Sequence, residues 1–296
     1  MKITVITVCK NAEAHIEQAI QSVVNQTYPN VEYLIIDGKS SDRTLDIVQK
    51  YASKIARVVS ELDGGIYAAM NKGIRMATGD FLYFLNSDDY LVNHQVFEKL
   101  ANFIAQQPKC DFVYGQMEMR IVQNNRTIHR VPRPPEELKE ALLWFSDGPQ
   151  HSASFFGRHL FEKLGLFDET YRISADYDWF LRLAQYPEAV VCYFPEIIAS
   201  FSNQGFSCRE QTLSLTEFFR VQNSAPLFQQ DDWLQQRVRY LQHEVISLHE
   251  SLSRAAKARP VFANTPRAKA LLEKGEDLRS QLADLLHSNR SNSINS

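Results

Sequence analysis

The sequence lacks any apolar run of the ~18 to 20 residues that a membrane-spanning helix requires. It also lacks an excess of basic residues, because its formal net charge is −3. Nucleic-acid-binding proteins usually show such an excess. These absences argue against a spanning helix and give no reason to expect a nucleic-acid partner.

Cysteine is scarce, with four residues in the whole chain. They are widely spaced, form no C-x-x-C pair and have no histidine at ligand spacing, so neither a zinc ribbon nor a disulfide scaffold is indicated. We therefore expect reduced thiols in a cytoplasmic protein. The cysteines are Cys9, Cys110, Cys192 and Cys208.

The first half of the sequence alternates strand and helix patterns. Residues 1–8 carry one charge before a short β-branched run, which suits a first buried strand better than an export segment. Repeated β-α-β units of this length predict a mostly parallel, doubly wound sheet with flanking helices. The expected strands are 2–8, 31–36, 57–60 and 81–85, with helices at 12–25, 41–51 and 66–77.

A short aromatic run, residues 81–85, leads directly into the tetrapeptide Asn86-Ser87-Asp88-Asp89. The run is typical of a buried strand in a covered parallel sheet. Acidic side chains at the carboxyl end of such a strand open into the crevice where α/β proteins bind ligands, and hard divalent cations bridge carboxylates to phosphates there. Taken alone, the tetrapeptide is equally consistent with a simple turn.

The other expected strand ends also carry polar residues or glycine. Because the carboxyl ends of parallel strands meet at one edge of a sheet, these junctions should converge on one cleft. Each residue alone would be read as a helix cap, but their joint placement favours a ligand site. The junction residues are Thr7, Cys9 and Asn11 after the first strand, 37–42 after the second, and Glu61, Asp63, Gly64 and Gly65 after the third.

Over residues 1–220 the chain resembles a family 2 glycosyltransferase of the GT-A fold, of the type that builds surface polysaccharides. The resemblance depends on several motifs in the expected order and not on any one alone. They are TVITVCKN at 4–11, IDGKSSD at 36–42, GIYAAMNKG at 65–73, NSDD at 86–89 and ADYD at 175–178.

The resemblance implies roles for single residues. Asp88 occupies the D-x-D position and should bind Mg²⁺ or Mn²⁺ on a diphosphate. Asp176 falls where such enzymes place the catalytic base, and His151 and Asp89 lie toward the acceptor or the leaving diphosphate. The resemblance assigns the nucleotide-sugar donor, through base, ribose or phosphate contacts, to Thr7, Cys9, Asn11, Asp37, Asp63, Asn71, Lys72, Asn86, Ser87 and Asp88.

The chain departs from the family pattern at several positions. Asn86 replaces the first carboxylate of D-x-D, and Gly38 replaces a frequent second acid after Asp37. Ala175 stands where the family usually carries the glutamate of a Glu-Asp pair. These departures keep Asp88 and Asp176 but leave donor identity and metal affinity open.

The second half is less regular. We expect a helix at 94–105, strands at 111–114 and 154–156, a ribbon and exposed loop over 117–138, and helices starting near Asp176 and after Gly205. An Asp178–Arg182 pair at i, i+4 is predicted to be structural. From Leu234 onward, leucine and valine recur at spacings of four and three, which predicts a helical hairpin or a short dimer seam.

Together these patterns predict a GT-A domain at 1–225, a C-terminal helical extension at 226–288 and a disordered tail at 289–296. The predicted activity is an inverting, metal-dependent transfer of a hexosyl or N-acetylhexosaminyl group from a UDP-sugar to a glycan or lipid-linked glycan. Peripheral contact with the inner face of the cell membrane and a homodimer through the C-terminal helices are further expectations. Two alternatives stay open: a sugar-phosphate nucleotidyltransferase and a noncatalytic assembly module.

Overall fold

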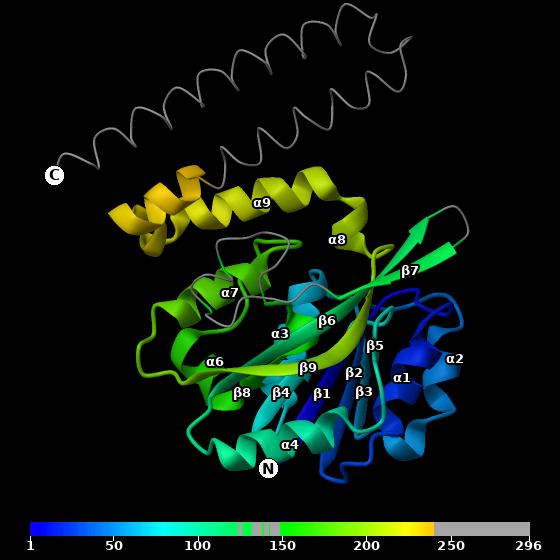
Figure 1. The fold of residues 1–296 in the computed structure, drawn as a ribbon. Coiled ribbons are helices and arrows are strands. Elements are labelled where there is room, and N and C mark those ends of the chain that lie inside the picture. The colour runs from blue at the N-terminus through cyan, green and yellow to red at the C-terminus, as the bar shows by residue number, and fades with distance from the viewer. Residues whose placement is uncertain (124–125, 132–137, 139–141, 143–148, 240–296) are drawn as a thin grey trace, which may run out of the picture. The chain divides into compact units, whose positions relative to one another are not determined.

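The computed structural model describes residues 1–123, 126–131, 138, 142 and 149–239. The chain separates after Leu227 into two compact units. The first unit contains the sheet and the helices α1 to α9 (Figure 1). In the second unit the described residues include a helix at 231–239. The predicted boundary at residue 225 stays a prediction.

One sheet runs through the first unit in the order β3-β2-β1-β4-β8-β6-β9-β5, and β7 pairs with β6. Its first four strands are parallel, whereas β8 is antiparallel to both β4 and β6. The predicted α/β fold with a mostly parallel sheet is therefore confirmed. The strands are β1 (Ile3–Cys9), β2 (Val31–Asp37), β3 (Arg57–Ser60), β4 (Phe81–Phe84), β5 (Tyr90–Leu91), β6 (Phe112–Gln123), β7 (Arg126–Arg130), β8 (Ser154–Gly157) and β9 (Val191–Ser202).

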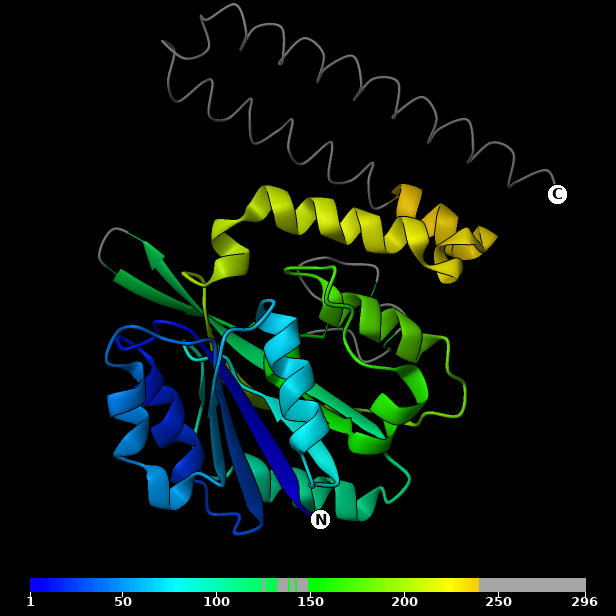
Figure 2. The same ribbon diagram turned by 180° about the vertical axis from the view of Figure 1, so that it is seen from behind.

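Helices cover both faces of the sheet (Figures 1 and 2). On one face, Ile3 and Val5 of β1 pack in a core with α1 and α4. On the other face, Ile6 meets α3 so closely that a Cβ on Gly73 would lie 2.5 Å from its Cγ2. The helices are α1 (Ile16–Val24), α2 (Thr44–Gln49), α3 (Ile66–Met76), α4 (Val96–Gln106), α6 (Arg158–Leu164), α7 (Ala175–Ala184), α8 (Phe206–Arg209) and α9 (Gln211–Ser224).

The long strand β9 is absent from the sequence prediction, because Pro195 interrupts its apolar pattern. Proline is tolerated in a sheet at a bulge, where no ladder hydrogen bond is needed. The register shows such a bulge, since Gly115 pairs with Phe194 and the next residue pairs with Ile197. A Cβ on Gly115 would lie 2.7 Å from the Phe194 carbonyl oxygen, so glycine is required opposite the bulge.

The cysteines correct one prediction. Cys110 and Cys192 form a disulfide between the starts of the parallel strands β6 and β9, with their Cα atoms 6.2 Å apart. Cys9 and Cys208 are free, as expected. Cys110 and Cys192 are 82 residues apart in the sequence. They meet because β6 pairs with β9, and β9 is the strand that the sequence did not predict.

The predictions for the ribbon at 117–138, for a membrane-spanning helix and for the C-terminal region remain to be compared with the structure. The expected ribbon over 117–138 is confirmed in part as the β6–β7 hairpin. Within the described residues, no helix is long and apolar enough to cross a membrane. Most of the leucine-rich C-terminal pattern and the predicted tail lie outside the described residues, although Leu234 and Val238 are exposed on the helix at 231–239.

Candidate active site

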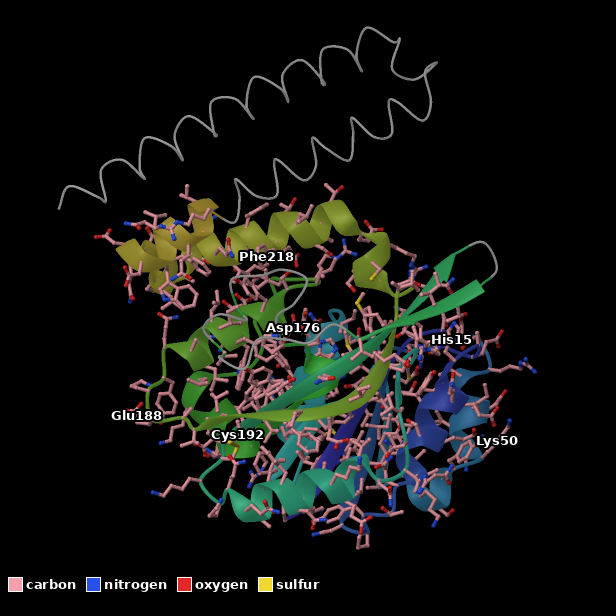
Figure 3. The ribbon with its side chains drawn as sticks, in the orientation of Figure 1. His15, Lys50, Asp176, Glu188, Cys192 and Phe218 are labelled. Atoms are coloured by element: carbon pink, nitrogen blue, oxygen red, sulfur yellow. A yellow bond between two sulfur atoms is a disulfide. The ribbon has the colours of Figure 1, made fainter. Side chains whose placement is uncertain are left out.

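The carboxyl ends of the parallel strands meet at one edge of the sheet, as the junction pattern predicted. Cys9 at the end of β1 pairs with Asp37 at the end of β2, which pairs in turn with Ser60 at the end of β3. In Figure 3, Asp176 lies toward this edge, whereas Cys192 lies away from it. The fold therefore gathers the candidate residues from several loops into one region.

Asp37 is the centre of the loop that follows β2, and it is 1 % exposed. Its Oδ1 accepts hydrogen bonds from the Ser40 hydroxyl and from Cys9 Sγ at 3.7 Å. Its Oδ2 accepts from Ser40 N at 3.0 Å and from the Ser60 hydroxyl at 2.6 Å. A carboxylate offers about four acceptor positions, so a base or ribose hydroxyl would have to displace one of these donors. The predicted direct contact with the nucleotide stays a prediction.

Asn11 ties the loop after β1 to the loop after β2. Its Oδ1 accepts a hydrogen bond from Ser41 N at 2.9 Å, and its own N–H donates to the Ser40 hydroxyl at 2.8 Å. Asn11 and Lys39 both adopt positive φ angles, 49° and 63°. Beneath this loop, burial and then the charge of Asp37 raise the pKa of the Cys9 thiol. The pair of loops is therefore held in a specific shape before any ligand arrives.

Asp63 lies directly against the loop after β2, because Gly38 has no side chain. A Cβ on Gly38 would lie 2.8 Å from Asp63 Oδ2. Asp63 Oδ1 accepts a hydrogen bond from Gly65 N at 3.1 Å, just before α3 begins. Nearby, Lys72 Nζ pairs with Glu61 Oε1 at 2.6 Å, and this bond lowers the pKa of Glu61. The structure thus brings Asp63 and Lys72 close to the loops that follow β2 and β3, and their predicted role in binding the nucleotide-sugar stays a prediction.

Two residues that were predicted to bind the nucleotide-sugar are fully buried. Thr7 is 0 % exposed, and its hydroxyl lies 3.1 Å from the Tyr33 hydroxyl. Asn71 is 1 % exposed, and its amide donates to Phe167 O and Glu169 Oε1 and accepts from Phe167 N. Both side chains have internal partners, so their role in donor binding stays a prediction.

The acidic tetrapeptide forms a turn between β4 and β5, in which Asp89 is buried and Asp88 is only partly buried. Asp89 is 1 % exposed and accepts hydrogen bonds from Ser202 N and the Ser152 hydroxyl, each at 3.0 Å. Burial, and then the adjacent charge of Asp88, raise the pKa of Asp89 to about 7. Ser87 lies half-buried in the turn. Asp89 therefore anchors the turn to β9, while Asp88 is half-buried.

Asp176 and His151 are in direct contact, although 25 residues separate them. His151 Nδ1 lies 2.8 Å from Asp176 Oδ2, and His151 Nε2 lies 3.0 Å from the side-chain nitrogen of Asn86. With Asn86 donating to Nε2, the Nδ1–H donates to Asp176. Burial would lower the pKa of His151, but the bond to Asp176 and the surrounding carboxylates raise it. A hydrogen-bonded path therefore links the candidate base to the acidic turn.

Asp176 lies in the first turn of α7, and its other oxygen is also held. Oδ1 accepts from the Tyr67 hydroxyl at 3.1 Å and from Tyr177 N at 2.9 Å. Of about four acceptor positions on a carboxylate, the bond to His151 leaves one on Oδ2. Among the described residues no other donor occupies that position, so it can accept a hydrogen bond from a substrate hydroxyl.

The predicted Asp178–Arg182 pair on α7 is present, with Arg182 Nη2 3.0 Å from Asp178 Oδ2. Arg182 Nη2 also donates to Leu166 O at 2.9 Å. The pair therefore fastens α7 to the preceding loop, which is the structural role expected for it.

Sequence reasoning missed several residues that shape the site. Tyr67 was part of a quoted motif but had no assigned role. Arg120 donates to the Asp88 carbonyl at 2.5 Å, and its guanidinium lies 4.2 Å from the centre of the Tyr90 ring. Gly205 gives room to Asp88, since a Cβ there would lie 3.1 Å from Asp88 Oδ2. Of these residues only Gly205 could have been found from the sequence, because a glycine after a strand indicates a turn.

The acidic turn offers few protein ligands for a divalent cation. In the described part of the chain, no group of three His, Cys, Asp or Glu side chains is arranged to hold a metal. Among the same residues, the Asp88 carboxylate makes no hydrogen bond. Mg²⁺ is commonly bound by one or two carboxylates together with substrate phosphates. The site therefore fits a cation that arrives with a diphosphate and does not fit a cation held by protein alone.

The arrangement can support transfer to a hydroxyl. A general base must lie within hydrogen-bond reach of the proton it removes, and Asp176 has an open acceptor position. A leaving group that gains negative charge requires compensating charge in place, and Asp88 can hold a cation for it. The hydrogen-bonded path from His151 to Asn86 places these two functions side by side.

Comparison with known proteins identifies the family and the fold. The family model for glycosyl transferase family 2 matches residues 4–165. A PGL/p-HBAD biosynthesis glycosyltransferase of Mycobacterium tuberculosis is 31 % identical over 198 residues, which are 66 % of this chain and 74 % of that protein. An uncharacterized glycosyltransferase of Haemophilus influenzae is 27 % identical over 186 residues, 62 % of this chain and 63 % of that protein.

Two solved structures share the fold at 19 % identity. Staphylococcus aureus TarS (residues 1–349), in complex with UDP-GlcNAc, superposes with a TM-score of 0.59 and covers 93 % of this chain and 79 % of that one. The mannosyltransferase PcManGT of Pyrobaculum calidifontis, in complex with GDP-Man and Mn²⁺, gives a TM-score of 0.62 and covers 98 % and 86 %.

Proposed function

Because the chain belongs to glycosyl transferase family 2, we propose that it is an inverting, metal-dependent enzyme that uses a UDP-sugar. The proposed acceptor is a hydroxyl of a surface polysaccharide or a lipid-linked oligosaccharide. The transferred group is a hexosyl or N-acetylhexosaminyl unit. The observation that carries the proposal is the contact of Asp176 with His151, which reaches the acidic turn through Asn86.

Asp176 is the proposed general base. It would accept the proton of the acceptor hydroxyl while that oxygen attacks the anomeric carbon from the side opposite the leaving diphosphate. The fixed orientation of the Asp176 carboxylate supports this role. Hydrogen bonds from Tyr67, His151 and Tyr177 N hold it, and one acceptor position on Oδ2 has no donor among the described residues. The family match ends at residue 165, so the assignment of Asp176 depends on this geometry and on the motif at 175–178.

The proposed donor site lies at the ends of β1, β2 and β3, with the half-buried Asp63 next to the first turn of α3. The exposed N–H groups of a helix N-terminus favour an anion such as a phosphate, and this one begins at Gly65. The proposed nucleotide is UDP; one structural neighbour binds UDP-GlcNAc and another binds GDP-Man.

Asp88 is the proposed protein ligand of Mg²⁺ or Mn²⁺. When bound, the cation would neutralise charge on the leaving diphosphate. The Asp88 carboxylate, which makes no hydrogen bond within the described part of the chain, supports this role, and Arg120 supports it indirectly by fixing the Asp88 backbone. The presence of Mn²⁺ with GDP-Man in PcManGT is in line with it.

The proposal includes a cytoplasmic location, with membrane contact and dimer formation through the C-terminal helices as further parts. A cytoplasmic location requires that the fold tolerate reduction of the Cys110–Cys192 pair, because such bonds are rare in that compartment. We expect tolerance, since β6 and β9 also pair along nine registered residues of backbone.

The first test is calorimetric titration with UDP in the presence of Mn²⁺, repeated with EDTA and with Asp88→Ala. We expect binding that EDTA abolishes and that Asp88→Ala weakens at least tenfold. Asp176→Asn should bind UDP as the wild type does but transfer sugar at least a hundredfold more slowly, a loss of the size that general-base catalysis contributes (about 10²–10⁴-fold). Undiminished transfer by Asp176→Asn would refute the base assignment.

A further inference from the structure

Glu217 lies on α9, and its carboxylate is buried without a cationic partner among the described residues. The residue is 5 % exposed. A buried carboxylate is costly unless several hydrogen bonds satisfy it. Here the donors are backbone N–H groups of one short segment: Arg172 N at 2.9 Å, Ile173 N at 2.8 Å and Ser174 N at 3.1 Å.

That segment ends where α7 begins, two residues before Asp176. The residue that precedes the helix, Ser174, makes no capping bond with its own side chain. The carboxylate of α9 therefore binds three successive N–H groups that no side chain of the segment satisfies. Carboxylates near a helix N-terminus are also favoured by its dipole.

The peptide units on either side of Ile173 are held by different helices. The Ile173 N–H is bound by Glu217, whereas the Ile173 carbonyl oxygen accepts a hydrogen bond from the Tyr67 hydroxyl of α3. The same hydroxyl lies 3.1 Å from Asp176 Oδ1. Two buried groups, one from α3 and one from α9, thus fix the backbone from which Asp176 extends.

We propose that Glu217 is a positioning residue for the reaction: it sets the path of residues 172–174 and so directs the Asp176 carboxylate toward His151 and the acceptor hydroxyl. The inference depends on the proposed role of Asp176 as the base. It assigns to α9 a part in the chemistry and not only in the packing of the domain. Glu217 itself contacts no reacting atom in this account.

Ser214 provides a matched control on the same helix. It is also buried, at 3 % exposure, and its hydroxyl donates to Ser207 O at 2.9 Å. Ser214→Ala therefore removes a hydrogen bond from α9 without reaching residues 172–174. Glu217→Gln keeps the size of the side chain but replaces one acceptor oxygen with an N–H₂ group, which must face either Arg172 N, 2.9 Å from Oε1, or all three N–H groups around Oε2.

Three properties are measured on the full chain of each variant. They are calorimetric affinity for UDP with Mn²⁺, release of the nucleotide from UDP-GlcNAc or GDP-mannose, and the ¹⁵N signals of the His151 ring, identified with His151→Gln. The ring signals report the Nδ1–H bond to Asp176 and require no substrate. For Glu217→Gln we expect turnover reduced by about ten- to a hundredfold, the cost of a displacement of about 1 Å in a catalytic group.

The same variant should keep its UDP affinity within about twofold, while its His151 signals move. Ser214→Ala should leave all three properties near wild type. Wild-type turnover together with unmoved His151 signals in Glu217→Gln would overturn the inference. Parallel losses of turnover and UDP affinity with a lower Tm would also overturn it, because they indicate a role in stability alone.

If Glu217→Gln does not fold, Glu217→Asp replaces it, since the shorter side chain keeps the charge but cannot reach all three N–H groups. Failure of the proposed function gives a different pattern. Asp176→Asn would then be as active as the wild type, whereas displaced His151 signals in the Glu217 variant would still show that Glu217 orients Asp176.

Discussion

Replacing Glu32 with glutamine should lower the stability of the fold at neutral pH. Glu32 is on β2, and its side chain is 12 % exposed. It accepts hydrogen bonds from the Thr4 hydroxyl at 2.6 Å, from Thr78 N at 2.8 Å and from the Thr78 hydroxyl at 2.7 Å, and Lys2 Nζ lies 3.1 Å away. The carboxylate therefore joins β2, β1 and the turn that leads into β4.

The size of the effect follows from the pKa of Glu32. Burial would raise this pKa, but the donors outweigh it and lower it from 4.5 to about 2. Each pKa unit corresponds to about 1.4 kcal/mol in favour of the charged form, so the interactions are worth about 3 kcal/mol. Because the folded-state pKa lies below the unfolded one, this stability is fully present above pH 4.5 and is lost as the pH falls toward 2.

The assay is urea unfolding followed by circular dichroism at several pH values between 7 and 3. At pH 7, Glu32→Gln should lower the free energy of unfolding by about 2–3 kcal/mol. Below pH 4.5, wild-type stability should fall more steeply than that of the variant, so the difference narrows. Glu13→Gln is the control, because the Glu13 side chain is 42 % exposed and its pair with Arg43, at 3.4 Å, is a surface pair worth little. A Glu32→Gln loss below 1 kcal/mol, or a difference independent of pH, would refute the reasoning.

Three further predictions concern the site and its support. Gly205→Ala should push the Asp88 carboxylate aside and weaken Mn²⁺-dependent UDP binding by about tenfold (about 1.4 kcal/mol), with Tm nearly unchanged; calorimetry and thermal unfolding measure both. Tyr67→Phe removes the hydroxyl that donates to the Ile173 carbonyl oxygen and one of the two donors of Asp176 Oδ1, so it should destabilise by about 1–3 kcal/mol and slow transfer without weakening UDP binding, and equal activity would contradict this. Dithiothreitol should lower the Tm of the oxidised wild type, reflecting about 2–4 kcal/mol from the Cys110–Cys192 bond, but should leave Cys192→Ser unaffected and both proteins active.

The parallel half of the fold could be predicted because each of its strands is a short run between turn residues, and three of them, β1, β2 and β4, are mostly buried. Residues 57–60 were located without error, and the other early strands within one or two residues, since apolar runs between turn residues are a local signal. The β9 strand could not be predicted, because Pro195 in a run of twelve residues reads as a break. Only the bulge opposite Gly115 explains why that proline is tolerated there.

The candidate site likewise contains residues that the sequence could predict and residues that it could not. Asp37, Asp63 and Asp88 follow strands, so the sequence placed them at one edge of the sheet. The contact of His151 with Asp176 could not be derived from the residues, because it depends on how α7 packs against the loop before β8. Glu217 gave no signal at all, since a glutamate on a helix is most often solvated.

The attachment of α9 to α7 determines where the protein can be shortened. The family model matches the chain only as far as residue 165, yet Glu217 binds the start of α7 and Gln222 donates to the Tyr177 hydroxyl at 3.0 Å. A recombinant fragment that ends with the family-model match at residue 165 would lack Asp176, and one that ends shortly before residue 217 would keep Asp176 but lose the carboxylate that binds residues 172–174. The smallest fragment suitable for enzymology or crystallisation should therefore extend through the end of α9 at Ser224.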